Sequence, residues 1–186
     1  VTVEQVLVAA TGLVPPEISS ASPDRLPTLE VLLARSGTLD MRNRNLGRAH
    51  VAQLLGAGAS VLAVVADVAR RRDAIASLLH APRFALDGAL VASEWCAPLA
   101  LRAHLHRLAD EPRAGGRLVM SDHASLEHVL DGPHAFDAIV VLDPPPTIGA
   151  RDRIAAAPTQ TSVHLTFGAR EERFTRAMIE AALNVR

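Results

Sequence analysis

The chain has no lysine, no tyrosine and one cysteine, and only 3% of its 186 residues are aromatic. A base-stacking platform of the OB or RRM kind needs aromatic rings, so this composition argues against one. The single cysteine, Cys96, excludes an internal disulfide framework and suits a reducing cytosol. All 19 basic residues are arginine, and the formal net charge of -1 argues against a broad nucleic-acid-binding field but not against local arginine clusters.

Long apolar runs are also missing. No run approaches the roughly 20 residues that span a bilayer, and the amino end lacks a basic segment followed by an apolar one. We therefore expect no membrane partner and a cytoplasmic location. The chain opens at Val1 with the strand-like stretch VTVEQVLVA rather than with methionine, which suggests a fragment of a longer protein.

Several motifs that mark chemistry are absent. No strand end carries the phosphate-cradling glycine pattern G-x-G-x-x-G or G-x-x-x-x-G-K-[ST]. The zinc patterns H-E-x-x-H and C-x-x-C and the hydrolase elbow G-x-S-x-G are missing as well. We expect no cofactor and no metal in this chain, and no catalytic residue is assigned.

Five short apolar runs, each ending at a polar or proline-marked turn, dominate what is present. Amphipathic stretches lie between most of them, which is the pattern of a parallel sheet covered by helices on both faces. The sequence predicts a three-layer, Rossmann-like α/β domain over residues 46–186, with a mostly parallel sheet of about five strands. The expected strands are Val61 to Ala66, Ala89 to Ala92, Arg117 to Met120, Ala138 to Leu142 and Val163 to Phe167. The expected helices are Gly47 to Leu55, Val68 to Leu79, Ala97 to Ala109, Ala124 to Leu130, Gly149 to Ala156 and Arg170 to Leu183.

Residues 1–45 differ from the rest, because prolines and serines at Pro15, Pro16, Ser19 and Ser20 break any regular alternation. We interpret this segment as a short irregular linker or the tail of a preceding domain. Within it, the stretch TLEVLLA, residues 28–34, is expected to form a short strand.

Three aspartates, Asp67, Asp122 and Asp143, follow predicted strands, and ligands bind at the carboxyl ends of strands in such sheets. Together with His123 they suit a divalent cation or acid-base chemistry. The simpler interpretation for Asp67 and Asp122 is helix capping, which contributes about 1 kcal/mol per cap. For Asp143 it is a structural turn, because three prolines follow directly and prevent a helix from starting there.

Two arginine clusters are candidates for contacts with phosphate groups. The first contains Arg42, Arg44 and Arg48, and the second contains Arg70, Arg71 and Arg72 just after a predicted strand. Solvated helix faces with carboxylate neighbours such as Asp73 explain both clusters equally well.

Three segments resemble, in order, the carboxyl-terminal region of bacterial RecJ, the single-strand-DNA-specific 5′-to-3′ exonuclease. They are DMRNR followed by VLAVVADVARRR within residues 40–72, then FDAIVVLDPPP at residues 136–146, and VHLTFGAREERF at residues 163–174. In that family the nuclease centre lies upstream, where aspartates and a D-H-H motif bind manganese or magnesium, and an OB-type domain follows. This chain has no D-H-H motif, and the stretch SDHA at residues 121–124 does not match it.

The resemblance implies a non-catalytic accessory domain of an exonuclease, a hydrolase of DNA repair and recombination. Residues 1–45 would then be the remnant of the OB-type domain. The implied partners are single-stranded DNA, the single-strand-binding protein and the upstream nuclease core. Three alternatives stay open, of which one is a purely structural or protein-docking module that binds neither DNA nor metal. Of the other two, one is a helicase-like RecA-type half without a Walker A loop, and the other is a stand-alone small-molecule enzyme that uses Asp67, Asp122, His123 and Asp143.

Overall fold

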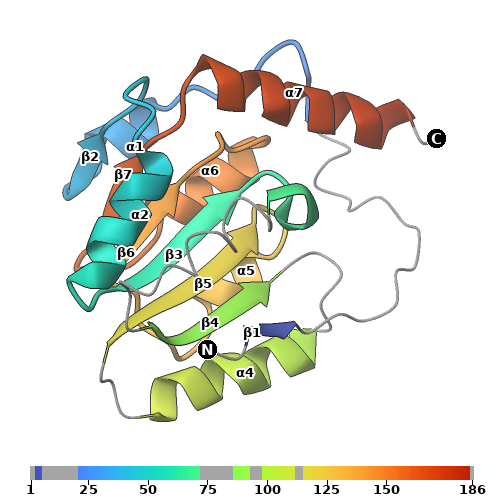
Figure 1. The fold of residues 1–186 in the computed structure, drawn as a ribbon. Helices are drawn as coiled ribbons and strands as arrows, with labels where there is room; N and C mark the ends of the chain where they lie inside the picture. The colour runs from blue at the N-terminus through green and yellow to red at the C-terminus, as the bar shows by residue number, and fades with distance from the viewer. Residues whose placement is uncertain (1–2, 6–20, 72–85, 93–97, 112–114, 185–186) are drawn as a thin grey trace.

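The computed structural model describes residues 3–5, 21–71, 86–92, 98–111 and 115–184 (Figure 1). Its centre is a parallel sheet of seven strands in the order β1-β4-β5-β3-β6-β7-β2. The five central strands are β4 (Leu86–Ala92), β5 (Gly116–Asp122), β3 (Ser60–Val65), β6 (Ala138–Val141) and β7 (Ser162–Leu165), and the two edge strands are β1 (Val3–Gln5) and β2 (Thr38–Asp40).

The central strands are rich in apolar residues because helices cover both faces of the sheet. Every residue of β3 is buried, and its side chains alternate between two cores. Leu62 and Val64 belong to the larger core, whereas Val61, Ala63 and Val65 belong to the smaller one. Fully buried apolar side chains on both faces explain why this sequence forms a strand inside the sheet and not at its edge.

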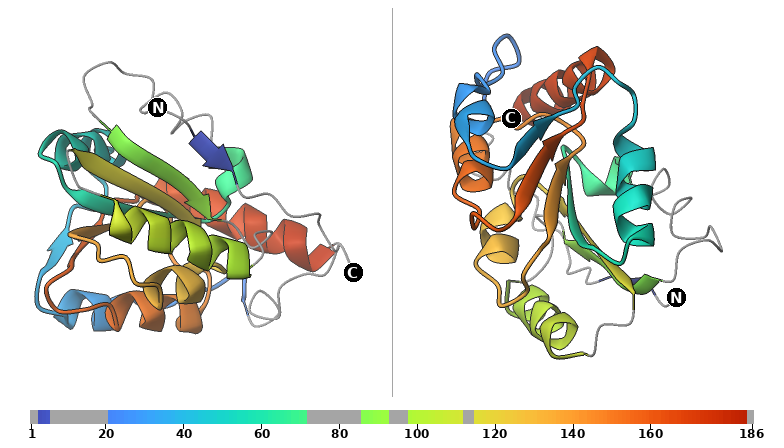
Figure 2. Two further views of the ribbon diagram at one scale, coloured as in Figure 1. Left: turned by 90° about the horizontal axis from the view of Figure 1, so that it is seen from below. Right: turned by 90° about the vertical axis from the view of Figure 1, so that its left-hand side faces the viewer.

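Six described helices surround the sheet, namely α1 (Glu30–Ala34), α2 (Gly47–Gly56), α4 (Pro98–Asp110), α5 (Leu126–Leu130), α6 (Ile148–Ala155) and α7 (Ala169–Asn184). Side chains of α1, α4, α5 and α6 fill the larger core, and side chains of α2 fill the smaller one on the opposite face (Figure 2). A further helical turn, residues 68–71, joins the smaller core through Val68. The longest helix, α7, runs along the carboxyl end of the sheet (Figure 1).

The distribution of helices follows from the strand order. Some connections run from one strand to another that lies nearer the β2 edge of the sheet. The helices in these connections, such as α5 and α6, cover the face with the larger core. Other connections run to a strand that lies nearer the β1 edge. Their helical segments, such as α2 and the turn at residues 68–71, cover the face with the smaller core. This division is expected when every crossover between parallel strands has the same right-handed sense.

These observations confirm the predicted three-layer α/β class and the five predicted strands, with bounds that differ by a few residues. The predicted strand at residues 28–34 is wrong, because α1 occupies residues 30–34. Only Leu32 in this helix is buried, while Val31 and Leu33 on either side are exposed, so the stretch presents one narrow apolar face to α6. Most of the predicted helix from Val68 to Leu79 lies outside the described residues, as does Arg72.

Two parts of the segment 1–45 belong to the sheet. Strand β1 pairs in parallel with β4, and β2 pairs in parallel with β7, so they form its two edges. The origin of this segment in an OB-type domain stays a prediction. None of the described helices combines the length and the apolar character that crossing a membrane requires.

Candidate functional site

Strands β3 and β6 are neighbours in the sheet, but the chain leaves them toward opposite faces. After β3 it enters the helical turn that carries Val68 in the smaller core. After β6 it leads to α6, whose Ile154 lies in the larger core. The carboxyl ends of β3 and β6 therefore flank a topological switch point, which is where open α/β sheets bind their ligands.

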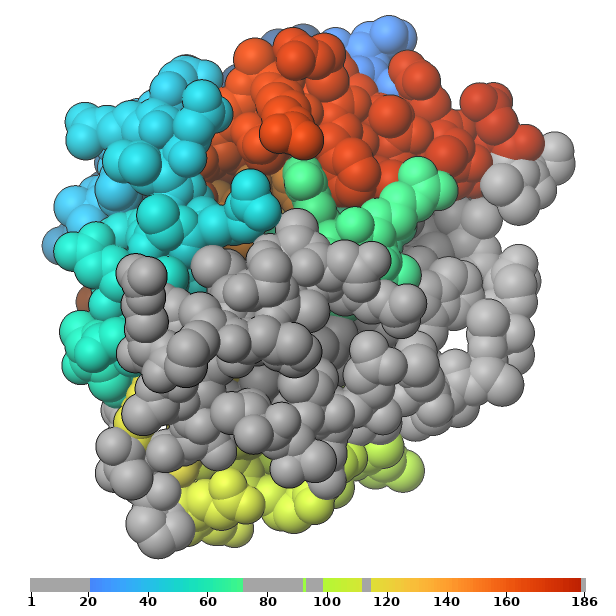
Figure 3. All heavy atoms as spheres, viewed as in Figure 1, coloured from blue at the N-terminus to red at the C-terminus, as the bar shows by residue number. Residues whose placement is uncertain are grey.

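A cavity of about 520 Å³ lies at this switch point. Its size falls in the range of roughly 300–1,000 Å³ that is usual for small-molecule sites. The residues that line it come from the carboxyl ends of three strands and from the helices that follow or precede them. They are Asn45, Gly47, Arg48, Val65, Arg71, Leu142, Thr166, Arg170 and Glu171. We call this the switch-point cavity, and in Figure 3 the elements around it, α2, residues 68–71 and α7, meet at the surface.

Glycine at the start of α2 allows the helix to approach the strand ends closely. A Cβ atom on Gly47 would come within 2.8 Å of Leu142 Cδ2 and 2.9 Å of Thr166 Oγ1, which is closer than real Cβ contacts. Two residues earlier, Asn45 has a φ of 52°, in the left-handed region that asparagine tolerates better than most residues. This turn brings the first turn of α2, with Arg48 next to Gly47, against the ends of β6 and β7.

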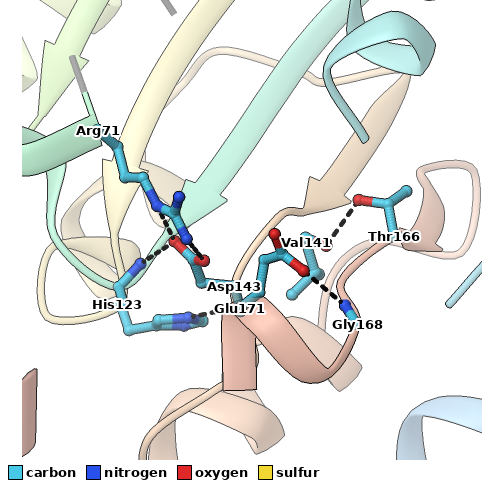
Figure 4. A network of polar contacts seen from close by, with 8 residues as sticks. Arg71, His123, Val141, Asp143, Thr166, Gly168 and Glu171 are labelled. Carbon is cyan, nitrogen blue, oxygen red and sulfur yellow. Dashed lines mark hydrogen bonds and ion pairs between the residues drawn. The ribbon is translucent and has the colours of Figure 1, made fainter. Parts of the chain in front are cut away.

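Asp143 is fully buried beneath the cavity and holds Arg71 in place (Figure 4). Its carboxylate accepts hydrogen bonds from Arg71 Nε at 3.0 Å and from Arg71 Nη2, and it also accepts one from the Ala66 backbone N–H at 3.0 Å. Burial raises the pKa of the Asp143 carboxyl, and the bonds from Arg71 and Ala66 offset part of that rise. The Arg71 guanidinium also lies over the Phe174 ring, 4.0 Å from its centroid, which adds a cation–π contact.

His123 supports the Asp143 turn from below. Its Nε2–H donates to the Asp143 carbonyl oxygen at 3.1 Å, and burial lowers the pKa of the imidazole to about 4 (Figure 4). The ring is therefore neutral near pH 7, and its buried Nδ1 has no hydrogen-bond partner among the residues that the structure describes. His123 and the prolines at residues 144–146 together fix the backbone that presents Asp143 to Arg71.

The other two strand-end aspartates bond to their own backbone segments. Asp67 Oδ1 accepts the Arg70 backbone N–H at 3.0 Å, which is a helix-capping contact. Asp122 Oδ1 accepts the backbone N–H and the hydroxyl of Ser125, at 2.9 and 2.7 Å. Among the described residues, no group of three or more acidic, histidine or cysteine side chains is arranged to hold a metal ion.

The two arginine clusters separate in the structure. Arg42 binds Asp40 through Nε and Nη2 at 2.8 and 2.7 Å, Arg44 is exposed, and Arg70 is exposed beside Asp67. One arginine from each cluster, Arg48 and Arg71, lines the switch-point cavity.

A third arginine was not singled out from the sequence. Arg170, the second residue of α7, lines the same cavity, and α7 begins shortly after β7 ends. The sequence does contain a signal for Arg170, because this residue lies two positions after Gly168, at the junction of a predicted strand and a predicted helix.

The charge around the cavity is unevenly compensated. The Arg71 guanidinium is paired with Asp143, and Glu171 Oε2 accepts the Gly168 backbone N–H at 2.9 Å, as a capping residue does at the start of a helix. Arg48 and Arg170 make no side-chain hydrogen bond or ion pair with any residue that the structure describes. The cavity thus has two arginines available to an anionic ligand, beside a third that is held rigidly.

Comparison with protein-family models, curated proteins and solved structures finds no match to this chain.

Proposed function

We propose that this chain is a non-catalytic accessory domain of a RecJ-like, single-strand-DNA-specific exonuclease, and that it contacts phosphate groups of the DNA at the switch-point cavity. The convergence of Arg48, Arg71 and Arg170 on one cavity carries this proposal. Manganese or magnesium would be bound by the upstream nuclease core of the same polypeptide, and the domain would act in the cytoplasm. The single-strand-binding protein is a second expected partner.

Arginine suits phosphate because its guanidinium is always charged and offers several N–H donors in a fixed plane. Neutralising a phosphate also releases condensed counterions, which makes binding favourable and dependent on salt. The formal net charge of the chain is only -1, so the positive charge that a strand would meet is local. We therefore expect binding that is modest in affinity and confined to a few phosphates.

The test is fluorescence anisotropy of a labelled single-stranded oligonucleotide at several salt concentrations. Because each lost phosphate contact lowers the salt slope by roughly 0.7 units for single strands, replacing Arg48 and Arg170 together by glutamine should lower it by about 1.4 units. Arg102→Gln is the matched control, because Arg102 is exposed on α4, away from the cavity lining. An equal loss in the Arg102 variant, or no loss in the double variant, would refute this site.

The small-molecule alternative predicts saturable binding of a divalent cation at the strand-end aspartates. Calorimetry with Mn²⁺ on the natural chain and on Asp122→Asn separates the two proposals. Binding of Mn²⁺ that the variant abolishes would favour the enzyme, whereas DNA binding unaffected by metal and by this variant would favour the accessory domain.

A further inference from the structure

We infer that the switch-point cavity selects a phosphate monoester, the group at the end of a phosphorylated strand or on a free mononucleotide, over the phosphodiester inside a strand. This inference rests on the proposed function, because it takes the cavity to be a phosphate site. It names the chemical form of the phosphate.

The charge of the cavity favours a monoester. A phosphate monoester carries about −1.5 to −2 charges near pH 7, and an internal phosphodiester carries about −1. Arg48 and Arg170 line the cavity with no carboxylate partner among the described residues, whereas the charge of Arg71 is balanced by Asp143. Glu171 also lines the cavity, so the three arginines face two carboxylates, Asp143 and Glu171, and the site keeps a net positive formal charge. A dianion is attracted to this charge more strongly than a monoanion is.

The three arginines reach the cavity from different elements. Arg48 comes from the first turn of α2, Arg71 from the helical turn after β3, and Arg170 from the first turn of α7. A monoester offers three terminal oxygens and one ester link, so it can be approached from three sides. An internal phosphodiester has two free oxygens, and its strand must continue on both sides of the phosphate.

The Arg71 side chain is held in place by its neighbours. Arg71 uses Nε and Nη2 on Asp143 and packs over Phe174, and none of the described residues accepts a hydrogen bond from its Nη1 donors. Because the guanidinium is already held, little side-chain entropy is lost when a ligand binds to Nη1. Arg48 and Arg170 are exposed and can close on a ligand from the other sides.

The size and polarity of the cavity also suit a phosphate monoester. A cavity of about 520 Å³ accommodates a compact group with part of its sugar or base. Val65 and Leu142 supply an apolar part of the lining on which a base or sugar can rest.

The experiment compares oligonucleotides of one sequence that carry a phosphate at one end, at the other end, or at neither. A terminal phosphate should raise affinity by about tenfold, the value of one additional charged hydrogen bond. Adenosine monophosphate and inorganic phosphate, titrated separately, should compete with the phosphorylated strand. The preference should shrink as the pH falls from about 7 to about 5, because the second phosphate ionisation has a pKa of about 6.

Two variants make the result specific to the cavity. Arg48→Gln and Arg170→Gln should each reduce the preference for the terminal phosphate, and Arg102→Gln should leave it unchanged. Arg48 and Arg170 are exposed, so both variants should fold, and thermal unfolding checks this.

The outcomes separate this inference from the proposed function. Equal binding of all three oligonucleotides, weakened by Arg48→Gln, would overturn the monoester preference and leave the DNA-binding proposal intact. Binding of adenosine monophosphate without binding of any oligonucleotide would identify a free nucleotide as the source and overturn the DNA proposal. Absence of binding by every ligand would overturn both.

Discussion

Lowering the pH should destabilise this fold through His123. Its side chain is 3% exposed, and burial lowers the pKa of the imidazole to about 4, compared with about 6.5 in an unfolded chain. As the pH falls through about 6.5, the unfolded chain binds a proton at His123, and the folded chain does not until about pH 4. The stabilisation that depends on a neutral His123 is therefore fully present above about pH 6.5, and it is lost progressively as the pH falls toward about 4.

The size of the effect follows from proton linkage. One proton of difference changes the free energy of unfolding by about 1.4 kcal/mol per pH unit. Between about pH 7 and about pH 4.5, His123 should account for a loss of about 2.5 kcal/mol. This is a large share of the roughly 5–15 kcal/mol by which ordinary domains are stable.

Urea unfolding followed by circular dichroism at several pH values measures this loss. His123→Gln keeps a side-chain N–H donor for the Asp143 carbonyl but cannot titrate, so its pH dependence should be weaker by about one proton. His106→Gln is the matched control, because His106 is exposed on α4. The reasoning is refuted if His123→Gln and the natural chain lose the same free energy over this range.

Three further outcomes can be measured by the same unfolding assay. Asp143→Asn should lower the free energy of unfolding by about 3 kcal/mol, because it leaves the partly buried Arg71 without its charge partner. A change near zero would contradict a stabilising role of the ion pair between Arg71 and Asp143. Gly47→Ala should lower the free energy of unfolding by about 1–3 kcal/mol, because the new Cβ collides with Leu142 and Thr166. It should also weaken DNA binding. An unchanged free energy of unfolding would show that the neighbouring side chains move aside without cost. Ile139→Ala should lower the free energy of unfolding by about 2–5 kcal/mol, since Ile139 is fully buried in β6. A smaller loss than that caused by Leu99→Ala, a substitution at an exposed residue, would argue against this core.

A second buried histidine, His164, adds to the acid sensitivity. His164 Nδ1 lies 2.5 Å from His50 Nε2, and burial, together with the proximity of His50, lowers the pKa of His164 to about 4. His164 Nε2–H donates to the Ser162 hydroxyl, which itself donates to the Asp137 carbonyl. His164 Nδ1 can accept a hydrogen bond from His50 only while the His164 ring is neutral, so the double variant of His123 and His164 should be less pH-dependent than either single variant.

The strands of the central sheet could be predicted because burial on both faces leaves continuous apolar runs such as VLAVV in β3. The edge strands were missed as members of the sheet, because three residues in each of β1 and β2 are too few for a pattern. The helix α1 was mistaken for a strand because only Leu32 of its apolar residues is buried, which hides the helical period in so short a stretch.

The candidate site was predictable only in part. A position after a strand identified Asp143 and Arg71 separately, but their pairing depends on β3 and β6 being neighbours, which a sequence does not reveal. Arg48 and Arg170 are 122 residues apart in numbering and meet only because β7 lies beside β6 and α2 packs against both. The strand order thus creates the cavity, and the sequence supplies its arginines.

The central claim is that the switch-point cavity is where this chain meets phosphate. The most direct test is nuclear magnetic resonance of the arginine Nε–H and backbone N–H signals during titration with a single-stranded oligonucleotide. The account predicts that the largest shifts fall on Arg48 and Arg170 and on the backbone around Gly47 and Gly168, while Arg102 stays unchanged. Shifts gathered on α4, or none at the cavity despite measurable binding, would contradict it.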